Sequence, residues 1–251
     1  MSLSNSGTSS NGWEYNVIRQ APLLNHNAAY TVLFRLYVPS SPAYWCAWCI
    51  GDSQAGASNW PPDRSQDQVR FKSDGHWLLR QYNGATIVDE VDAGAASGST
   101  WYSVAIIRTD ASHLKLRLWS AQGSGTTTSG GVVDISGRAS TRIETLFSDG
   151  TDVMASGTKY TNYKSWNVAL SDGELDAEVL TTVVSKSSGL YSVSPMSDTS
   201  TVAGNLTQTG SAADWYFAGS TIIAGANDPN TTYATAGGIP KTSKLTLLGV
   251  G

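Results

Sequence analysis

The chain has 251 residues, a mass of 26.5 kDa and a formal charge of −4, and only 14% of its residues are charged. So little positive charge, scattered singly, excludes a nucleic-acid binder that relies on counterion release. No apolar run approaches the roughly 18 residues of a membrane-spanning helix. The 25 Gly, 9 Trp and 11 Tyr are typical of an all-β protein built from short strands and polar turns.

The first residues, 1–12, are mostly Ser, Asn and Gly without periodicity, and we expect them to form a disordered leader. They have neither a basic start nor an apolar core, so the sequence shows no signal peptide. Strand-like runs separated by turn signals follow, and no linker is long or biased enough to mark a second domain. The main runs are 30–38, 44–50, 69–72, 76–82, 101–108, 114–119 and 156–166.

Two pairs of these runs have the spacing of hairpins. A turn at Ser73-Asp74-Gly75 joins the runs 69–72 and 76–82. A second turn, at Asp110-Ala111-Ser112, joins the runs 101–108 and 114–119. We expect each pair to form adjacent antiparallel strands.

The two cysteines form a C-x-x-C motif, Cys46 to Cys49, inside the apolar run 44–50. Such a run predicts a buried strand, on which positions three apart point to opposite faces, so we expect the thiols to diverge. A redox pair needs a helix N-terminus, and a zinc site needs two further ligands that the three scattered histidines do not supply. Buried structural thiols are therefore expected.

One segment has clear helical signals. Ser171 and Glu174 form a capping-box pattern, and Leu170 before the cap can pack on Leu175 as a hydrophobic staple. The apolar residues that follow recur on one face at helical spacing. We expect a helix over about 172–182.

Three segments together resemble a known family: the strand 30–38, the W-Y-S-V-A strand within 100–108, and the W-N-V-A-L-S-D-G-E-L strand and helix within 164–175. They resemble the laminin-G-like branch of the concanavalin A-like lectin/glucanase superfamily. The resemblance implies a jelly-roll sandwich of two antiparallel sheets with one short helix, which we place at 13–217. Residues 218–251 follow as a C-terminal extension, either a closing strand or a contact with another subunit.

The same superfamily contains glycoside hydrolases with an E-[LIV]-D-x-E signature, and Glu174 to Glu178 reads E-L-D-A-E. That chemistry needs a strand, whose alternation places all three carboxylates on one face. On a helix Asp176 points away from the other two. Because Glu174 already belongs to the capping box, we expect a helix here and no catalytic residues.

A binding surface remains, because nine tryptophans exceed what a core of this size needs and aromatic rings stack on sugars. We expect Trp45, Trp48, Trp101, Trp119 and Trp166 to lie in the core. On the strand 76–82, either Trp77 or the alternate set with His76 must face outward. The predicted carbohydrate-binding residues are Trp60, Arg64, Trp77, Arg80, Tyr82 and Tyr163.

These features predict a non-catalytic, lectin-like module that binds a glycan or polysaccharide, or that decorates a larger particle such as a phage virion. We expect it outside a cell or on a virion surface, with other virion or cell-surface proteins as further partners, and with no nucleic acid and no membrane span. The alternatives are a glycoside hydrolase or polysaccharide lyase of the superfamily, with His76 or His113 as base, and a structural protein-binding module. No cofactor is expected; Ca2+ at the loop carboxylates Asp52, Asp149 and Asp152 stays an open alternative.

Overall fold

The computed structural model describes residues 2–5, 17–20, 24–25, 28–40, 42–51, 66–83, 86–110, 113–119, 126–132, 143–146, 154–194, 196, 209–210, 216–217 and 222–225. Within these residues the chain forms sixteen strands and the helix α1 (Asp172–Glu178). The strands are β1 (Ser2–Asn5), β2 (Val17–Gln20), β3 (Tyr30–Val38), β4 (Cys46–Gly51), β5 (Gln66–Phe71), β6 (His76–Asn83), β7 (Thr86–Ala95), β8 (Thr100–Arg108), β9 (His113–Trp119), β10 (Thr126–Val132), β11 (Ile143–Leu146), β12 (Lys159–Trp166), β13 (Leu190–Ser194), β14 (Thr209–Gly210), β15 (Tyr216–Phe217) and β16 (Ile222–Gly225).

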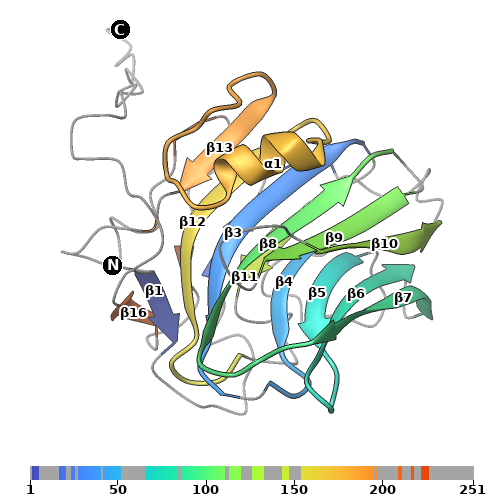
Figure 1. Ribbon diagram of the computed structural model, residues 1–251, viewed down its shortest axis with the longest axis vertical. Helices are drawn as coiled ribbons and strands as arrows, with labels where there is room; N and C mark the ends of the chain where they lie inside the picture. The colour runs from blue at the N-terminus through green and yellow to red at the C-terminus, as the bar shows by residue number, and fades with distance from the viewer. Residues whose placement is uncertain are drawn as a thin grey trace, which may run out of the picture.

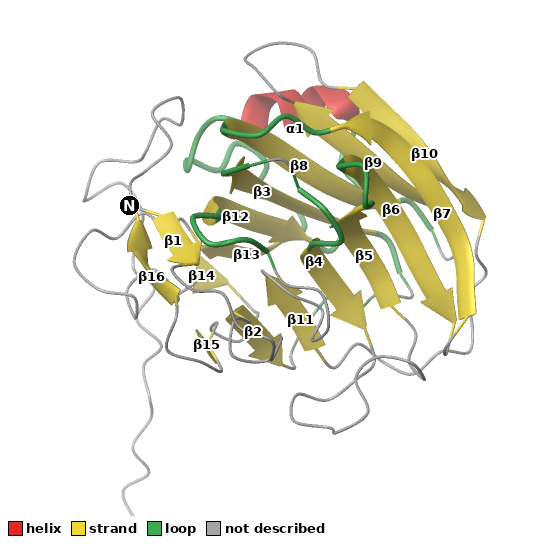
Figure 2. Cartoon of the chain, turned by 90° about the horizontal axis from the view of Figure 1, so that it is seen from below, coloured by secondary structure: helices red, strands yellow, loops and turns green. Residues whose placement is uncertain are grey.

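The strands form two antiparallel sheets that pack face to face, as Figure 2 shows. Sheet A has the order β10-β9-β8-β3-β12-β1-β16, and β13 and β14 extend it beside β12. Sheet B has the order β15-β2-β11-β4-β5-β6-β7. Strands β10 and β7 lie side by side where the two sheets meet (Figure 2). This arrangement confirms the predicted all-β sandwich.

Both predicted hairpins are present. Strand β5 pairs with β6 as far as Phe71 opposite Trp77, and β8 pairs with β9 as far as Arg108 opposite Leu114. In the first turn Gly75 has a φ of +82°, a conformation that glycine adopts at no steric cost. The turn chemistry in the sequence therefore sets the register of the strands that carry the site.

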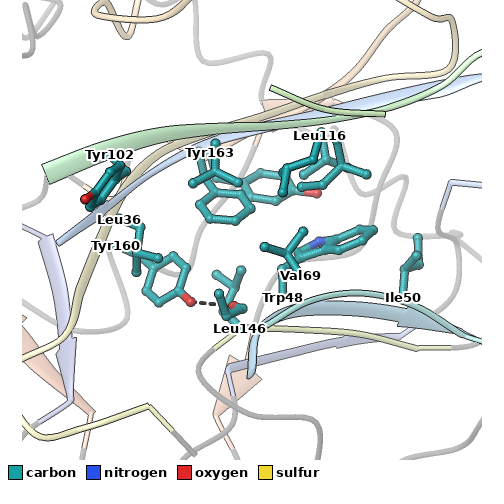
Figure 3. Close-up of a cluster of buried hydrophobic side chains, with 14 of the residues drawn as sticks. Leu36, Trp48, Ile50, Val69, Tyr102, Leu116, Leu146, Tyr160 and Tyr163 are labelled. Carbon is teal, nitrogen blue, oxygen red and sulfur yellow. Dashed lines mark hydrogen bonds between the residues drawn. The ribbon is translucent and has the colours of Figure 1, made fainter. Parts of the chain in front are cut away.

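Apolar side chains on the facing sides of the two sheets form the main core. Figure 3 shows Trp48, Ile50 and Val69 of sheet B opposite Leu116 and Tyr163 of sheet A, all of them buried. Alternate residues of β3 and β8 also face this core. Burial of a large apolar side chain stabilises the fold by about 1.5–3 kcal/mol, so this layer is the main source of stability.

Two buried carboxylates tie the sheets together. Asp67 of β5 accepts hydrogen bonds from Arg108 at 2.8 and 2.9 Å and from the Tyr30 hydroxyl at 2.9 Å. Glu144 of β11 accepts one from the Tyr163 hydroxyl at 2.5 Å. Burial and then the charge of Asp67 raise the pKa of Tyr30 well above its usual value. Because buried polar groups are costly when unpaired, these contacts fix how the sheets face each other.

Helix α1 begins where the sequence predicts. The Ser171 hydroxyl accepts a hydrogen bond from the Glu174 N–H at 3.4 Å, and the Glu174 carboxylate accepts one from the Ser171 N–H at 2.9 Å. This geometry confirms the capping box. The helix lies over the outer face of sheet A, in front of β12 and β3 in Figure 1. There Leu175 packs in a second apolar cluster that includes Leu33 and Trp166.

The helix ends at Glu178, earlier than the sequence pattern predicts, and Lys164 explains why. The Lys164 ammonium donates to the backbone carbonyls of Glu178 at 3.1 Å and Val183 at 3.0 Å, and to the Glu178 carboxylate at 2.6 Å. That carboxylate also accepts the N–H groups of Ser185 and Lys186, at 2.6 and 2.5 Å. These contacts replace the hydrogen bonds of a further helical turn. Desolvation lowers the pKa of Lys164, although Glu178 opposes the shift.

The E-L-D-A-E motif therefore lies on a helix, as predicted, and its carboxylates have separate partners. Glu174 belongs to the cap, and Glu178 belongs to the buried ion pair with Lys164. Asp176 accepts a hydrogen bond from Trp119 Nε1 at 3.0 Å. The three carboxylates do not converge on one surface, so the motif lacks the geometry of a glycosidase signature.

The predicted leader and extension both contribute to sheet A. Residues 2–5, expected to be disordered, form β1 and pair with β12 and β16, so the prediction is wrong for them. A polar composition did not prevent this, because a strand is held by backbone groups. Strand β16, in the extension, closes the edge beside β1. Residues 6–12 and 226–251 lie outside the described residues.

Both cysteines are fully buried, as predicted, but they do not diverge. A β-bulge between Cys46 and Trp48 adds one residue to β4 relative to β5. Cys46 lies opposite Arg70 and Cys49 opposite Gln68, and these partners are two residues apart on β5. Both thiols therefore lie on the outer face of sheet B.

Candidate functional site

Two of the predicted sugar-binding residues belong to the core, so their predicted exposure is wrong. Trp77 is 1% exposed, with its ring centroid 4.3 Å from that of Phe71. Alternation along β6 carries it to the side that faces sheet A. Tyr163 is fully buried because a bulge at Asn162, whose φ is +53°, shifts the faces of β12 by one residue.

Two other predicted residues share one surface. Arg80 and Tyr82 lie two residues apart on β6, and both are half-buried on the outer face of sheet B. His76 lies on the same side of β6. Of the two alternatives for the strand 76–82, the set with His76 therefore faces outward and Trp77 faces inward. Trp60 and Arg64 lie outside the described residues.

Cross-strand pairs define the rows of this outer face. Arg80 lies between Gln68 of β5 and Glu90 of β7, and Tyr82 lies opposite Ile87 of β7. Opposite residues in an antiparallel pair share a face, so these side chains form one surface. Gln68 is fully buried, whereas Ile87 is 45% exposed, so the face opens toward β7.

The Arg80 guanidinium is held from two sides. Its Nε donates to Glu90 Oε2 at 2.6 Å, and an Nη atom donates to the Tyr82 hydroxyl at 3.1 Å. The guanidinium carbon also lies 5.8 Å from the centroid of the Tyr82 ring. The Arg80 and Glu90 side chains are 17% and 31% exposed, so the pair remains accessible from solvent. The result is a fixed array of planar polar groups beside an aromatic ring.

A second charged cluster occupies the other end of the same face. Asp92 of β7 contacts Lys72 Nζ at 2.8 Å and His76 Nδ1 at 3.0 Å. The hydrogen bond from Lys72, then those from the Gly94 N–H and His76, hold the pKa of Asp92 well below its usual range. The hydrogen bond to Asp92 raises the pKa of Lys72. Asp92 is therefore an ionised, hydrogen-bonded acceptor and is not a proton donor at neutral pH.

The described side chains of this face offer hydrogen-bond donors, acceptors and an aromatic ring. His76 and His113, the two candidate bases of a lyase, lie on different sheets, and His113 pairs with Asp110 at 2.8 Å. Across the described ranges, no three His, Cys, Asp or Glu side chains gather as metal ligands. The carboxylates considered for Ca2+, at 52, 149 and 152, lie outside those ranges. Nor does the described helix have the length and apolar character to cross a membrane.

The chain matches no protein-family model and no curated protein sequence. Among solved structures, it is similar to a heptameric SAP-like pentraxin from Limulus polyphemus, with 16% identity, a TM-score of 0.44, and coverage of 70% of this chain and 79% of that chain. It is also similar to the CBM40 of a Ruminococcus gnavus IT-sialidase bound to α2,3-sialyllactose, with 18% identity, a TM-score of 0.44, and coverage of 70% and 96%.

A third similar structure is the enzymatically active domain of tailspike protein 2 from bacteriophage CBA120, with 13% identity and a TM-score of 0.46. The match covers 71% of this chain and 29% of that one. By its own sheet topology the chain is an all-β sandwich of two antiparallel sheets, with the short helix α1 on the outer face of sheet A.

Sequence reasoning missed three surface residues. Glu90, which holds Arg80, could not be assigned without the register of β7. Tyr37 and Trp101 are half exposed and adjacent on the outer face of sheet A, so the prediction that Trp101 lies in the core is wrong. The available signal was alternation in β3, where Tyr37 shares the phase of the charged Arg35.

Proposed function

We propose that the chain is a non-catalytic, lectin-like module that binds a glycan on the outer face of sheet B. The observation that carries the proposal is the Arg80 guanidinium, held between the Glu90 carboxylate and the Tyr82 hydroxyl. Planar polar groups recognise sugar hydroxyls, and groups that are already fixed lose little entropy on binding.

The surface beside these groups is suited to the apolar face of a sugar ring. Tyr82 is half-buried and lies opposite Ile87 of β7, and Val88, which follows Ile87 in the chain, is 40% exposed. An aromatic ring with adjacent apolar surface supports stacking of the apolar face of a sugar ring. Because Glu90 neutralises Arg80, the array favours hydroxyl groups over a strongly charged substituent.

The proposal places the chain outside a cell or on the surface of a virion, where glycans and neighbouring surface proteins are encountered. The test is a glycan array with the purified chain, followed by calorimetric titration of the best ligand in the presence and absence of Ca2+. We expect Tyr82→Ala to weaken binding about tenfold, or ~1.4 kcal/mol, and Tyr82→Phe to weaken it less.

Tyr44→Ala is the matched control, because Tyr44 is 61% exposed and is not on β6 or β7. We expect this control to bind like the unaltered chain, and all three variants to keep the melting temperature. Undiminished binding by Tyr82→Ala, or equal losses in Tyr82→Ala and Tyr44→Ala, would contradict a site on the outer face of sheet B.

A further inference from the structure

A second candidate surface lies on the opposite side of the sandwich. Lys159 of β12 is opposite Tyr37 of β3, and Tyr37 is opposite Trp101 of β8. The three side chains therefore form one row across the outer face of sheet A, and each is half exposed. We call these three residues the Tyr37–Trp101 platform.

The platform is an aromatic pair beyond the area covered by the helix. The ring centroids of Tyr37 and Trp101 are 5.4 Å apart, at an interplanar angle of 51°. Helix α1 packs over the outward residues Leu33 and Ala105, and neither platform aromatic belongs to that apolar cluster. Two large aromatic side chains thus remain partly exposed on this face of sheet A.

Arg35 supports the platform from the adjacent row. It is only 4% exposed, it donates to the Ser103 hydroxyl at 3.0 Å, and its guanidinium carbon lies 5.8 Å from the Trp101 ring centroid. A buried guanidinium beside the indole fixes the ring and adds positive potential at this point. Trp101 is therefore pre-positioned.

Lys159 supplies an accessible cation at the other end of the row. Its Nζ lies 4.9 Å from the Tyr37 ring centroid, and among the described residues no carboxylate lies within salt-bridge distance of it. Lys72, Lys164 and Lys186, in contrast, each pair with an Asp or Glu. Lys159 is thus positioned by an aromatic ring and not by an anion of the described chain.

We propose that the Tyr37–Trp101 platform binds an acidic polysaccharide, with a sugar ring stacked on the Trp101 indole and a carboxylate facing Lys159. Stacking uses the apolar face of the ring, and the ammonium selects a uronic acid over its neutral analogue. Lys159 and Trp101 are two strand spacings apart, about 10 Å, a span suited to two linked sugar rings. This site goes beyond the one proposed on sheet B, from which it is separated by the core.

The experiment titrates the full chain with a galacturonic acid tetramer and with its methyl ester, which keeps the ring and removes the charge. We expect tighter binding of the acid, weakened by added salt because the lysine head group is exposed. Trp101→Ala abolishes binding of both ligands. Lys159→Gln weakens binding of the acid about fivefold and leaves binding of the ester unchanged, as expected for an exposed ion pair.

Lys115→Gln is the matched control, because Lys115 is a half-exposed, outward lysine on β9 of the same sheet. We expect it to change neither titration. Equal affinities for the acid and the ester, no binding of either, or equal losses in Lys115→Gln and Lys159→Gln would overturn the proposal. Lys159→Gln decides the matter if Trp101→Ala fails to fold. Loss of acid binding in Tyr82→Ala but not in Lys159→Gln would assign the ligand to sheet B instead.

Discussion

Replacing Glu178 by Gln changes one atom and removes the negative charge that faces Lys164 beneath α1. Both side chains are fully buried in this ion pair. One amide oxygen can still accept the N–H groups of Ser185 and Lys186, but an NH2 group replaces the oxygen that contacts the ammonium at 2.6 Å. Lys164 keeps two backbone carbonyls and loses its counter-charge.

Removing one partner of a buried ion pair costs about 3–5 kcal/mol, because the remaining charge is left uncompensated. We therefore expect Glu178→Gln to lower the free energy of unfolding by that amount. At ~2–4 °C per kcal/mol for a chain of this size, the melting temperature falls by about 6–20 °C. Urea titration followed by tryptophan fluorescence measures the change.

Asp172→Asn is the control from the same helix, since Asp172 pairs with Arg117 but its side chain is 61% exposed. We expect this substitution to cost no more than about 1 kcal/mol. If Glu178→Gln changes stability as little as Asp172→Asn does, the pair is not a buried, mutually dependent contact and the reasoning is refuted.

Three further predictions concern the cap, the core and the thiols. The hydrogen bonds from Lys186 and Ser171 lower the pKa of Glu174 from an ordinary 4.5 to about 2, so its stabilising contribution is present above pH 4.5 and is lost as the pH falls toward 2. The melting temperature of Glu174→Gln should therefore fall less steeply than that of the unaltered chain between pH 4.5 and pH 2. Identical pH profiles of the two proteins would contradict this role of Glu174. Trp77→Ala should destabilise the chain by about 3–5 kcal/mol in denaturant titration, and a cost below about 1 kcal/mol would place the indole outside the core. A thiol reagent should label neither Cys46 nor Cys49 in the native chain and both after unfolding, whereas labelling without unfolding would contradict their burial.

Local signals in the sequence were sufficient for several elements. The capping box of Ser171 and Glu174 started α1 where predicted, because a cap depends on neighbouring residues alone. The two hairpins followed from turn residues such as Gly75. Where α1 ends could not be predicted, because the carbonyl of its last residue, Glu178, is bound by Lys164 of β12, which is not a sequence neighbour of that residue.

The facing of individual aromatic residues was less predictable, for two physical reasons. Strand β8 is covered by the core on one side and by α1 on the other, so it is apolar in both phases and Trp101 gave no sign of its outward direction. Single-residue bulges at Cys46–Trp48 and at Asn162 reverse the alternation beyond them, and nothing local in the sequence marks them. This is why Tyr163 was assigned to the wrong face and why the two thiols were expected to point to opposite faces.

The pairing of β1 with β16 has a consequence for the order in which the chain assembles. Asn5 lies opposite Ile222, so two segments from distant parts of the sequence meet at one edge. Strand β1 also pairs with β12 through Leu3 and Tyr160, which are synthesised long before β16. Once β1 has paired with β12 and β14 has paired with β13, the loop that must close for β16 to pair with β1 is only the short segment between Gly210 and Ile222. Because the entropy of closure depends on the free segment and not on total separation, a contact with a very long sequence separation forms last at a small entropic cost.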